Sequence, residues 1–216
     1  MSSMKRMMLL LLCILLLAGC APQTEPDTMS SITVETTLPV EAPTADGDAE
    51  LTALDVALAD GKVLTLSVWG RQDRNTMMYG VREIRVYQGK DLLQTLPMAE
   101  AIEADGVDGI APGYTESFSI EAAAELKDVD FDGNADLEIC AWCPNNAVPY
   151  YYWLWNKEKE CFEYALTLQL RDVDTENRQL VAWYKVENGL YHTDYYRVNA
   201  EKELELLKRE VEDVRP

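Results

Sequence analysis

Histidine is almost absent from this chain, because His192 is the only one in 216 residues. A single histidine cannot supply a Ser-His-Asp triad together with a histidine-based zinc site, and Cys-His catalysis would have one candidate only. Next to Tyr191 in a strand-like segment, His192 is more typical of a structural or surface position. No spacing among the many carboxylates identifies a pair for glycoside hydrolysis. We therefore expect a protein that is not an enzyme, and we assign no catalytic residues.

Basic residues are scarce, with 19 Lys and Arg against 38 Asp and Glu. Removing Lys5 and Arg6 with an N-terminal signal would leave 17 basic residues and a net charge of −21. Such an anionic body repels nucleic acid and acidic lipid head groups, so we expect no nucleic-acid partner. Cationic partners and divalent ions are favoured instead. Simple solubility of an exported protein would explain the same charge.

The chain also lacks an apolar run long enough to cross a membrane. The run from Met7 to Leu17 has 11 residues, whereas a spanning helix needs about 20. It follows Lys5 and Arg6, so it reads as the core of a signal peptide. It ends in Leu17-Ala-Gly-Cys20, which resembles the bacterial lipoprotein processing box. A secretory peptide with a chance cysteine is the alternative.

This resemblance implies that residues 1–19 are removed and that Cys20 is lipidated. The protein would then be held by its lipid at the cell membrane or outer membrane, outside the cytoplasm. The segment 20–50 is rich in proline and threonine and contains seven acidic residues but no Lys or Arg. We expect it to be a disordered acidic stalk. The remaining residues, 51–216, suffice for one domain with a core.

Three cysteines remain in that domain, Cys140, Cys143 and Cys161. An odd number in an exported protein implies one disulfide with a free thiol, or no disulfide. Cys140-Ala-Trp-Cys143 has the spacing of a redox dithiol, but redox motifs lie at a helix N-terminus, which lowers the thiol pKa. The pair here lies on an expected strand, Leu137–Cys143, so we expect no catalytic redox role.

The pattern predicts β-strands throughout the domain, because short segments of alternating apolar and polar residues are separated by turn residues. The expected strands are residues 63–69, 81–87, 92–96, 118–120, 137–143, 150–155, 161–170, 180–186 and 190–198. Gln88–Asp91 and Asn188-Gly189 predict two hairpins. The fold class is therefore all-β, with antiparallel hairpins in a propeller-like or sandwich arrangement.

Other segments are less regular. Residues 98–114 contain three glycines and a proline, which predicts a long loop. Glu121–Leu126 fits either a helical turn or a strand. The tail fits a helical stripe or a final strand, and we favour the strand. The aromatic residues between Tyr150 and Phe162 are expected to form core and sheet face.

The most informative segment is Asp128-Val-Asp130-Phe-Asp132-Gly133-Asn-Ala-Asp136. Aspartates fall at every second position except where Asn134 stands, and the glycine permits a sharp turn. Ca²⁺ takes six to eight oxygen ligands, and alternate side chains of a curled loop can converge on one ion. Without an ion the carboxylates would repel one another. A solvated acidic turn is the alternative.

Comparison with the EF-hand template refines this expectation. Asp128, Asp130, Asp132 and Asp136 match ligand positions, but the glutamate expected at the twelfth position is Ile139. The missing bidentate ligand argues against a two-helix sensor hand. A strand after the loop fits a structural calcium site of a β-protein. The predicted ligands are Asp128, Asp130, Asp132, the Asn134 carbonyl and Asp136, with water or Glu138 completing the shell.

The segment Leu126–Ile139 resembles the calcium loop of FG-GAP/VCBS-type repeats, which occur in propeller blades. With Arg82–Tyr87, Leu92–Leu96, Tyr152–Asn156 and Phe162, the pattern is similar to a family of bacterial exported lipoproteins. Its characterised member is a calcium-binding lysozyme-type inhibitor. The likeness covers residues 60–200, and only its loop is specific.

This resemblance implies a calcium-stabilised, non-enzymatic β-domain that binds another macromolecule. A cationic protein such as a lysozyme-type peptidoglycan hydrolase would be the partner, since a strongly acidic body attracts a basic surface. The alternative is an enzyme or accessory protein that acts on envelope glycans through acidic residues.

Overall fold

The structure is a computed structural model that describes residues 47–106, 113–144 and 148–216. The expected signal peptide, the lipidation site Cys20 and the stalk up to residue 46 lie outside the described residues. Strands predominate in the described part. They are β1 (Ala49–Ala57), β2 (Val63–Gln72), β3 (Tyr79–Gln88), β4 (Asp91–Pro97), β5 (Ala124–Lys127), β6 (Asp136–Cys140), β7 (Tyr150–Asn156), β8 (Cys161–Leu168), β9 (Leu170–Asp174), β10 (Gln179–Glu187), β11 (Leu190–Val198) and β12 (Leu204–Asp213). One helix, α1, spans Met98–Asp105.

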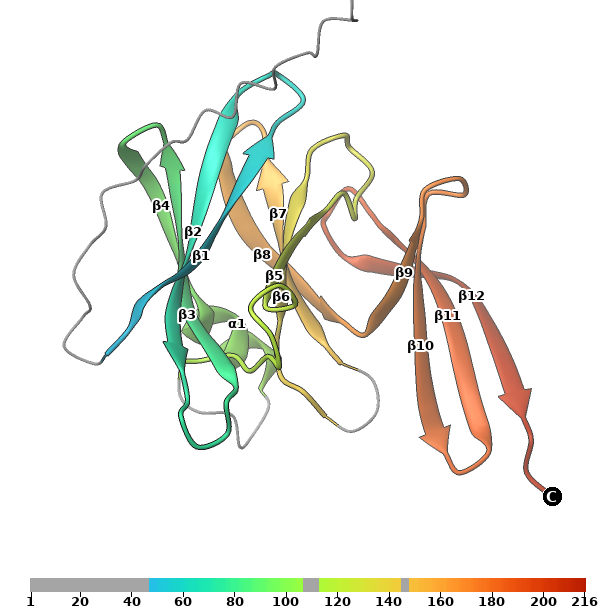
Figure 1. Cartoon of the computed structure of the whole chain (residues 1–216). Coiled ribbons are helices and arrows are strands. Elements are labelled where there is room, and N and C mark those ends of the chain that lie inside the picture. Colours follow the sequence, from blue (N-terminus) through green and yellow to red (C-terminus); the bar gives the residue numbers. More distant parts are fainter. Residues whose placement is uncertain (1–46, 107–112, 145–147) are drawn as a thin grey trace, which may run out of the picture. The chain divides into compact units, whose positions relative to one another are not determined.

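The strands form three antiparallel sheets of four strands each (Figure 1). Their orders are β1-β2-β3-β4, β5-β6-β7-β8 and β12-β11-β10-β9. Every strand therefore pairs with its neighbour in sequence, which is the arrangement that short alternating segments and tight turns favour. The expected all-β class with antiparallel hairpins is confirmed at this level.

Both predicted hairpins are present. β3 pairs with β4 from Glu83 opposite Pro97 to Gln88 opposite Asp91, and β10 pairs with β11 across the Asn188-Gly189 turn. Gly189 has a φ of 78°, a left-handed conformation that glycine adopts without steric cost. The favoured final strand is also confirmed, since β12 pairs with β11 along its length.

Buried apolar residues form two clusters. The first joins the β1–β4 sheet and α1 to one side of the β5–β8 sheet, and it includes Leu66, Ile84 and Trp153. The second joins the other side of β7 and β8 to the β9–β12 sheet through residues such as Tyr152 and Leu180. Alternate residues of β7 thus enter different clusters, as the period of two in a strand requires.

The aromatic segment is core, as predicted. Tyr151, Tyr152, Trp153, Trp155 and Phe162 are all at most 4% exposed. Their rings pack edge-on, for example Trp155 against Phe162 with centroids 5.0 Å apart. Edge-to-face packing of this kind adds about 0.5–1.5 kcal/mol per pair to simple burial.

The expected loop over 98–114 is wrong at its start, where α1 occupies Met98–Asp105. The sequence Met-Ala-Glu-Ala-Ile-Glu-Ala-Asp is rich in strong helix formers. Gly106 ends the helix in a left-handed conformation with a φ of 66°, and its N–H donates to the Ile102 carbonyl. Met98 and Ala101 are buried and attach α1 to the first cluster. None of the described helices is long and apolar enough to cross a bilayer.

Three strand predictions also need correction. Residues 118–120 form no strand, and Phe118 is 72% exposed. The expected strand 161–170 is two strands, which separate at Gln169. The expected strand 137–143 ends at Cys140, so Cys143 lies beyond it. The ambiguous segment 121–126 contributes to β5 as a strand.

β1 was not among the expected strands because its sequence does not alternate cleanly. It begins at Ala49, two residues before the expected start of the domain. Asp48, just before it, is buried and pairs with Arg82 at 2.9 Å.

Candidate metal centre

The acidic loop lies between β5 and β6, within the middle sheet. Apolar and acidic residues alternate along this loop, and the two kinds of side chain differ in their surroundings. Val129 is fully buried in the second apolar cluster and Phe131 packs against that cluster, whereas Asp128 and Asp130 are half-buried. Gly133 has a φ of 90°, which confirms the sharp turn predicted at this glycine.

Three of the predicted ligands come together. Carboxylate oxygens of Asp128, Asp130 and Asp136 all lie within 4.8 Å of one another. Asp132 is exposed and is not part of this group. The structure therefore gathers three of the four aspartates.

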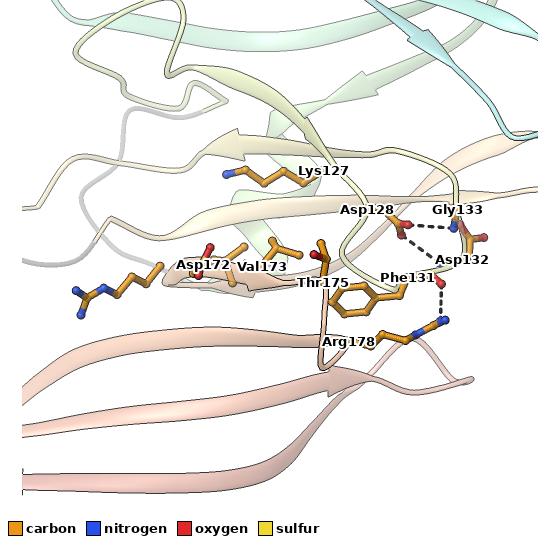
Figure 2. Close-up of a pocket in the computed structure, with 11 residues that line it drawn as sticks. Lys127, Asp128, Phe131, Asp132, Gly133, Asp172, Val173, Thr175 and Arg178 are labelled. Atoms are coloured by element: carbon orange, nitrogen blue, oxygen red, sulfur yellow. Dashed lines mark hydrogen bonds between the residues drawn. The ribbon is translucent and has the colours of Figure 1, made fainter.

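Hydrogen bonds within the loop maintain its curl. Asp128 accepts from the backbone N–H of Asp132 at 3.1 Å and of Gly133 at 3.0 Å (Figure 2). Asp130 accepts from the Asp132 N–H at 3.2 Å. These bonds explain why alternate aspartates bend the chain around a common centre. Burial raises the pKa of Asp128, and the neighbouring charges of Asp130 and Asp132 raise it further.

Asp136 is the most buried carboxylate of the group, with 0% of its surface exposed. Its two oxygens accept backbone N–H groups from Val129 and from Trp155 of β7, each at 2.9 Å. Burial raises the pKa of Asp136 to about 7, against the opposing effect of the Trp155 N–H, and the charge of Asp130 adds to the rise. A positive charge close to Asp136 would favour the ionised form of its carboxylate.

One positive charge is already present. Lys202, in the turn between β11 and β12, forms an ion pair with Asp130. Burial opposes the charged form of this lysine, but the bond to Asp130 and the charges of Asp136 and Asp132 raise its pKa on balance. Lys202 therefore supplies charge compensation to the aspartates from another sheet.

Asn134 and Glu138 have roles that the sequence did not indicate. The side chain of Asn134 is buried, and its amide N–H₂ donates to Asp132 at 3.1 Å. Glu138 accepts from Lys127 Nζ and from the Tyr152 hydroxyl, each at 2.5 Å. Both of its oxygens are therefore already hydrogen-bonded, and Glu138 is not part of the group of three converging carboxylates.

The loop makes hydrogen bonds to turns from the other two sheets. The Asn134 Oδ1 accepts from Ala59 N in the β1–β2 turn at 3.0 Å. Arg178, in the β9–β10 turn, donates to the Phe131 carbonyl at 2.5 Å. Together with Lys202 of the β11–β12 turn, these contacts connect the acidic loop to all three sheets.

A cavity of about 690 Å³ is lined in part by residues of this loop. Figure 2 shows Asp128, Asp132 and Phe131 on one wall and Asp172 and Thr175 on another. The remaining lining residues include Lys127, Arg171 and Arg178. The cavity is therefore lined by charges of both signs, with an aromatic ring at the loop.

The donor set fits a hard cation in part. Calcium requires six to eight oxygen ligands at about 2.3–2.6 Å, and Asp128, Asp130 and Asp136 offer carboxylates. Each carboxylate oxygen that accepts one N–H retains a further lone pair. Backbone carbonyls or water would supply the other ligands, and Lys202 would have to share Asp130 with the ion.

Sequence reasoning missed the residues that reach this site from afar. Ala59 lies 75 residues from Asn134 and Lys202 lies 72 residues from Asp130. No local pattern marks either residue. His192, the lone histidine, packs its ring 5.6 Å from that of Tyr184 on β10 and is not among the residues lining the cavity.

Comparison of the chain with protein-family profiles, with curated proteins and with solved structures found no match.

Proposed function

We propose that this chain is an exported lipoprotein whose β-domain is stabilised by Ca²⁺ and binds another macromolecule outside the cytoplasm. Cys20 carries the lipid anchor, and the ion is held by Asp128, Asp130 and Asp136 with oxygens of the same loop. The ion is structural, because the loop joins two strands rather than two helices that could open.

The observation that carries this proposal is that the acidic loop, which belongs to the middle sheet, contacts turns of both other sheets. Its carboxylates converge within 4.8 Å, and its residues bond to turns of both other sheets. An ion at such a point would strengthen contacts between distant parts of the chain. The four-strand meander of each sheet is also the unit from which propeller blades are built, which supports the propeller-like alternative.

The partner we propose is a cationic protein, such as a peptidoglycan hydrolase of the lysozyme type, whose activity the domain inhibits. The net charge of −19 for the whole chain favours it, since charge complementarity speeds association with a basic protein. The cavity beside the loop, with Asp128, Asp132 and Asp172 in its lining, would receive a basic side chain of that partner.

Calcium binding is tested by thermal unfolding with Ca²⁺ and with chelator. If free Ca²⁺ exceeds Kd by ten- to a hundredfold, the gain is about 1.4–2.7 kcal/mol. For a domain of this size the melting temperature should rise by about 3–10 °C. The variant D128N/D130N should lose the rise. An unchanged melting temperature and no heat of binding by calorimetry would reduce the loop to an acidic turn.

The partner class is tested by measuring muramidase activity on peptidoglycan with and without the purified protein. Inhibition that is saturable and that weakens at high salt is expected. A specific observation also favours a second candidate, a glycan-acting enzyme, because three carboxylates line the cavity. Hydrolysis of peptidoglycan by the protein alone, lost in D172N, would favour that candidate and contradict inhibition.

A further inference from the structure

Two thiols approach each other at the end of β6. The Sγ atoms of Cys140 and Cys143 are 3.8 Å apart. Both thiols also lie near one acceptor, the Glu116 carbonyl, at 3.1 Å from Cys140 Sγ and 3.5 Å from Cys143 Sγ. The two side chains therefore converge on the same point from the same segment.

The backbone around the first thiol is well fixed. The Cys140 N–H donates to the Ala123 carbonyl at 3.1 Å, and the Ala141 N–H donates to the Pro149 carbonyl at 3.0 Å. Ala141 in turn accepts from the Glu116 N–H at 3.1 Å. Cys140 is also buried.

Trp142, Cys143 and Pro144 have no regular secondary structure. Cys143 is half-buried, and Trp142 packs against the first apolar cluster with its ring 6.4 Å from that of Tyr151. Rotation of the Cys143 side chain can therefore move its sulfur without disturbing a strand.

We propose that Cys140 and Cys143 form an intrachain disulfide when the protein meets a disulfide oxidant. A disulfide requires an S–S distance of about 2.05 Å, so the two sulfurs must approach by less than 2 Å from their present 3.8 Å separation. The bridge would close a tight loop around Trp142 and fasten it to the core.

The third cysteine is the one left unpaired. Cys161 begins β8, opposite Asn156 of β7, and forms no part of the group around the Glu116 carbonyl. The positions of the three thiols therefore indicate which two would pair. The bridge would lie at the end of β6, and the remaining thiol would be the one on β8.

The chemistry balances with glutathione disulfide as the oxidant. Burial raises the pKa of Cys140, and Cys143 is the more accessible of the two thiols, so Cys143 begins the exchange as its thiolate. It attacks one sulfur of the oxidant, forms a mixed disulfide and releases one glutathione thiolate. Cys140 then loses its proton and attacks the Cys143 sulfur, which releases the second glutathione. Two electrons pass to the oxidant, and the protein gains one S–S bond.

This bridge is distinct from a catalytic dithiol. Oxidoreductase motifs have a thiolate stabilised at a helix N-terminus, whereas Cys140 ends a strand. An exported protein would meet the oxidant in its own compartment. Formation of the bridge requires neither the proposed export nor calcium, so it can be tested on the purified chain.

The test uses the purified full-length protein, reduced and then incubated with glutathione disulfide in its folded state. Remaining thiols are alkylated after denaturation, and tryptic peptides are weighed. Trypsin leaves Cys140 and Cys143 together on peptide Asp128–Lys157 and Cys161 on peptide Glu160–Arg171. The Cys161 peptide is therefore an internal control.

We expect peptide Asp128–Lys157 to be lighter than its dithiol form by two hydrogens and to carry no alkyl group. The C161S variant should behave in the same way, and C143S should leave Cys140 alkylated. Two alkyl groups or two glutathiones on the peptide would overturn the proposal. A cross-link from either thiol to Cys161 as the main product would also overturn it.

Discussion

At the scale of single residues, the acidic loop contains a conflict between burial and charge. Asp136 is fully buried and its pKa is raised to about 7. An unfolded aspartate has a pKa near 3.8, so the folded state retains a proton that the unfolded state has released. The stabilisation that comes from protonated Asp136 is complete below about pH 4 and is lost as the pH rises to 7.

We predict a pH dependence that belongs to this residue. In chelator, the free energy of unfolding of the wild type should fall relative to that of D136N by roughly 1 kcal/mol per pH unit between pH 4 and 7. Calcium should suppress the fall. Urea unfolding across this range measures it, with D91N as a control that removes the same charge from an exposed position on β4. A difference independent of pH would contradict the prediction.

Lys202 illustrates how one side chain can compete with an ion. Its ammonium group pairs with Asp130, so it neutralises the carboxylates when no metal is bound and repels a cation that approaches. We predict that K202Q lowers stability in chelator by about 1 kcal/mol and binds Ca²⁺ several-fold more tightly.

Calorimetric titration of K202Q with Ca²⁺, alongside urea unfolding in chelator, would test both parts of this prediction. K157Q is the matched control, since Lys157 is exposed in the β7–β8 turn. If K202Q binds calcium more weakly than wild type, the lysine supports the site rather than competing for it.

At the scale of elements, β12 adds one buried ion pair to its backbone pairing with β11. The strand is exposed along nearly all of its length. Asp194 of β11 is fully buried, and Arg209 of β12 donates two hydrogen bonds to it at 2.6 Å. The hydroxyls of Tyr184 and Tyr196 also donate to Asp194, at 2.9 and 2.8 Å. Polar contacts thus replace apolar packing at this edge.

The bond to Arg209 lowers the pKa of Asp194 to about 2, against the effect of burial, and the tyrosine hydroxyls lower it further. A lowered pKa means that the stabilisation is present above about pH 4 and is lost as the pH falls towards 2. This is the opposite direction to that of Asp136.

We predict that R209M lowers the free energy of unfolding by about 2 kcal/mol at pH 7, because it leaves a buried carboxylate without its cation. The loss of stability between pH 4 and 2 should also become smaller. Denaturation at pH 7 and acid unfolding measure the two effects. K208M is the control, since Lys208 and Glu210 form an exposed pair, which is typically worth about 0–1 kcal/mol. Equal costs for the two variants would exclude a special role for Asp194.

At the scale of the whole molecule, the domain is one part of the proposed lipoprotein and the anchor is another. We predict that replacing Cys20 with alanine releases the protein from membranes, because a single 11-residue apolar run is too short to hold it in a bilayer. Fractionation after an alkaline wash provides the measurement. C161S is the control, since it removes a cysteine from β8 instead. Retention of the alanine variant in the membrane fraction would exclude lipidation as the anchor.

The sequence by itself determined the features that depend on near neighbours. Alternation of side chains predicted most strands, the Asn188-Gly189 pair predicted its hairpin, and Gly133 predicted the turn of the acidic loop. These succeed because a strand's two faces and a turn's backbone angles are set within a few residues. The same reasoning missed helix α1. The glycines of the segment indicated a loop, although the segment also contains a run of helix formers.

The tertiary structure decided which groups meet at the acidic loop. Asp132 is separate from the three aspartates that converge, Glu138 bonds to Lys127 and Tyr152, and Lys202 arrives from 72 residues away. Whether a carboxylate faces an ion, a lysine or solvent depends on how separate sheets pack against the loop. That packing is set by contacts between distant segments, and no local pattern encodes it.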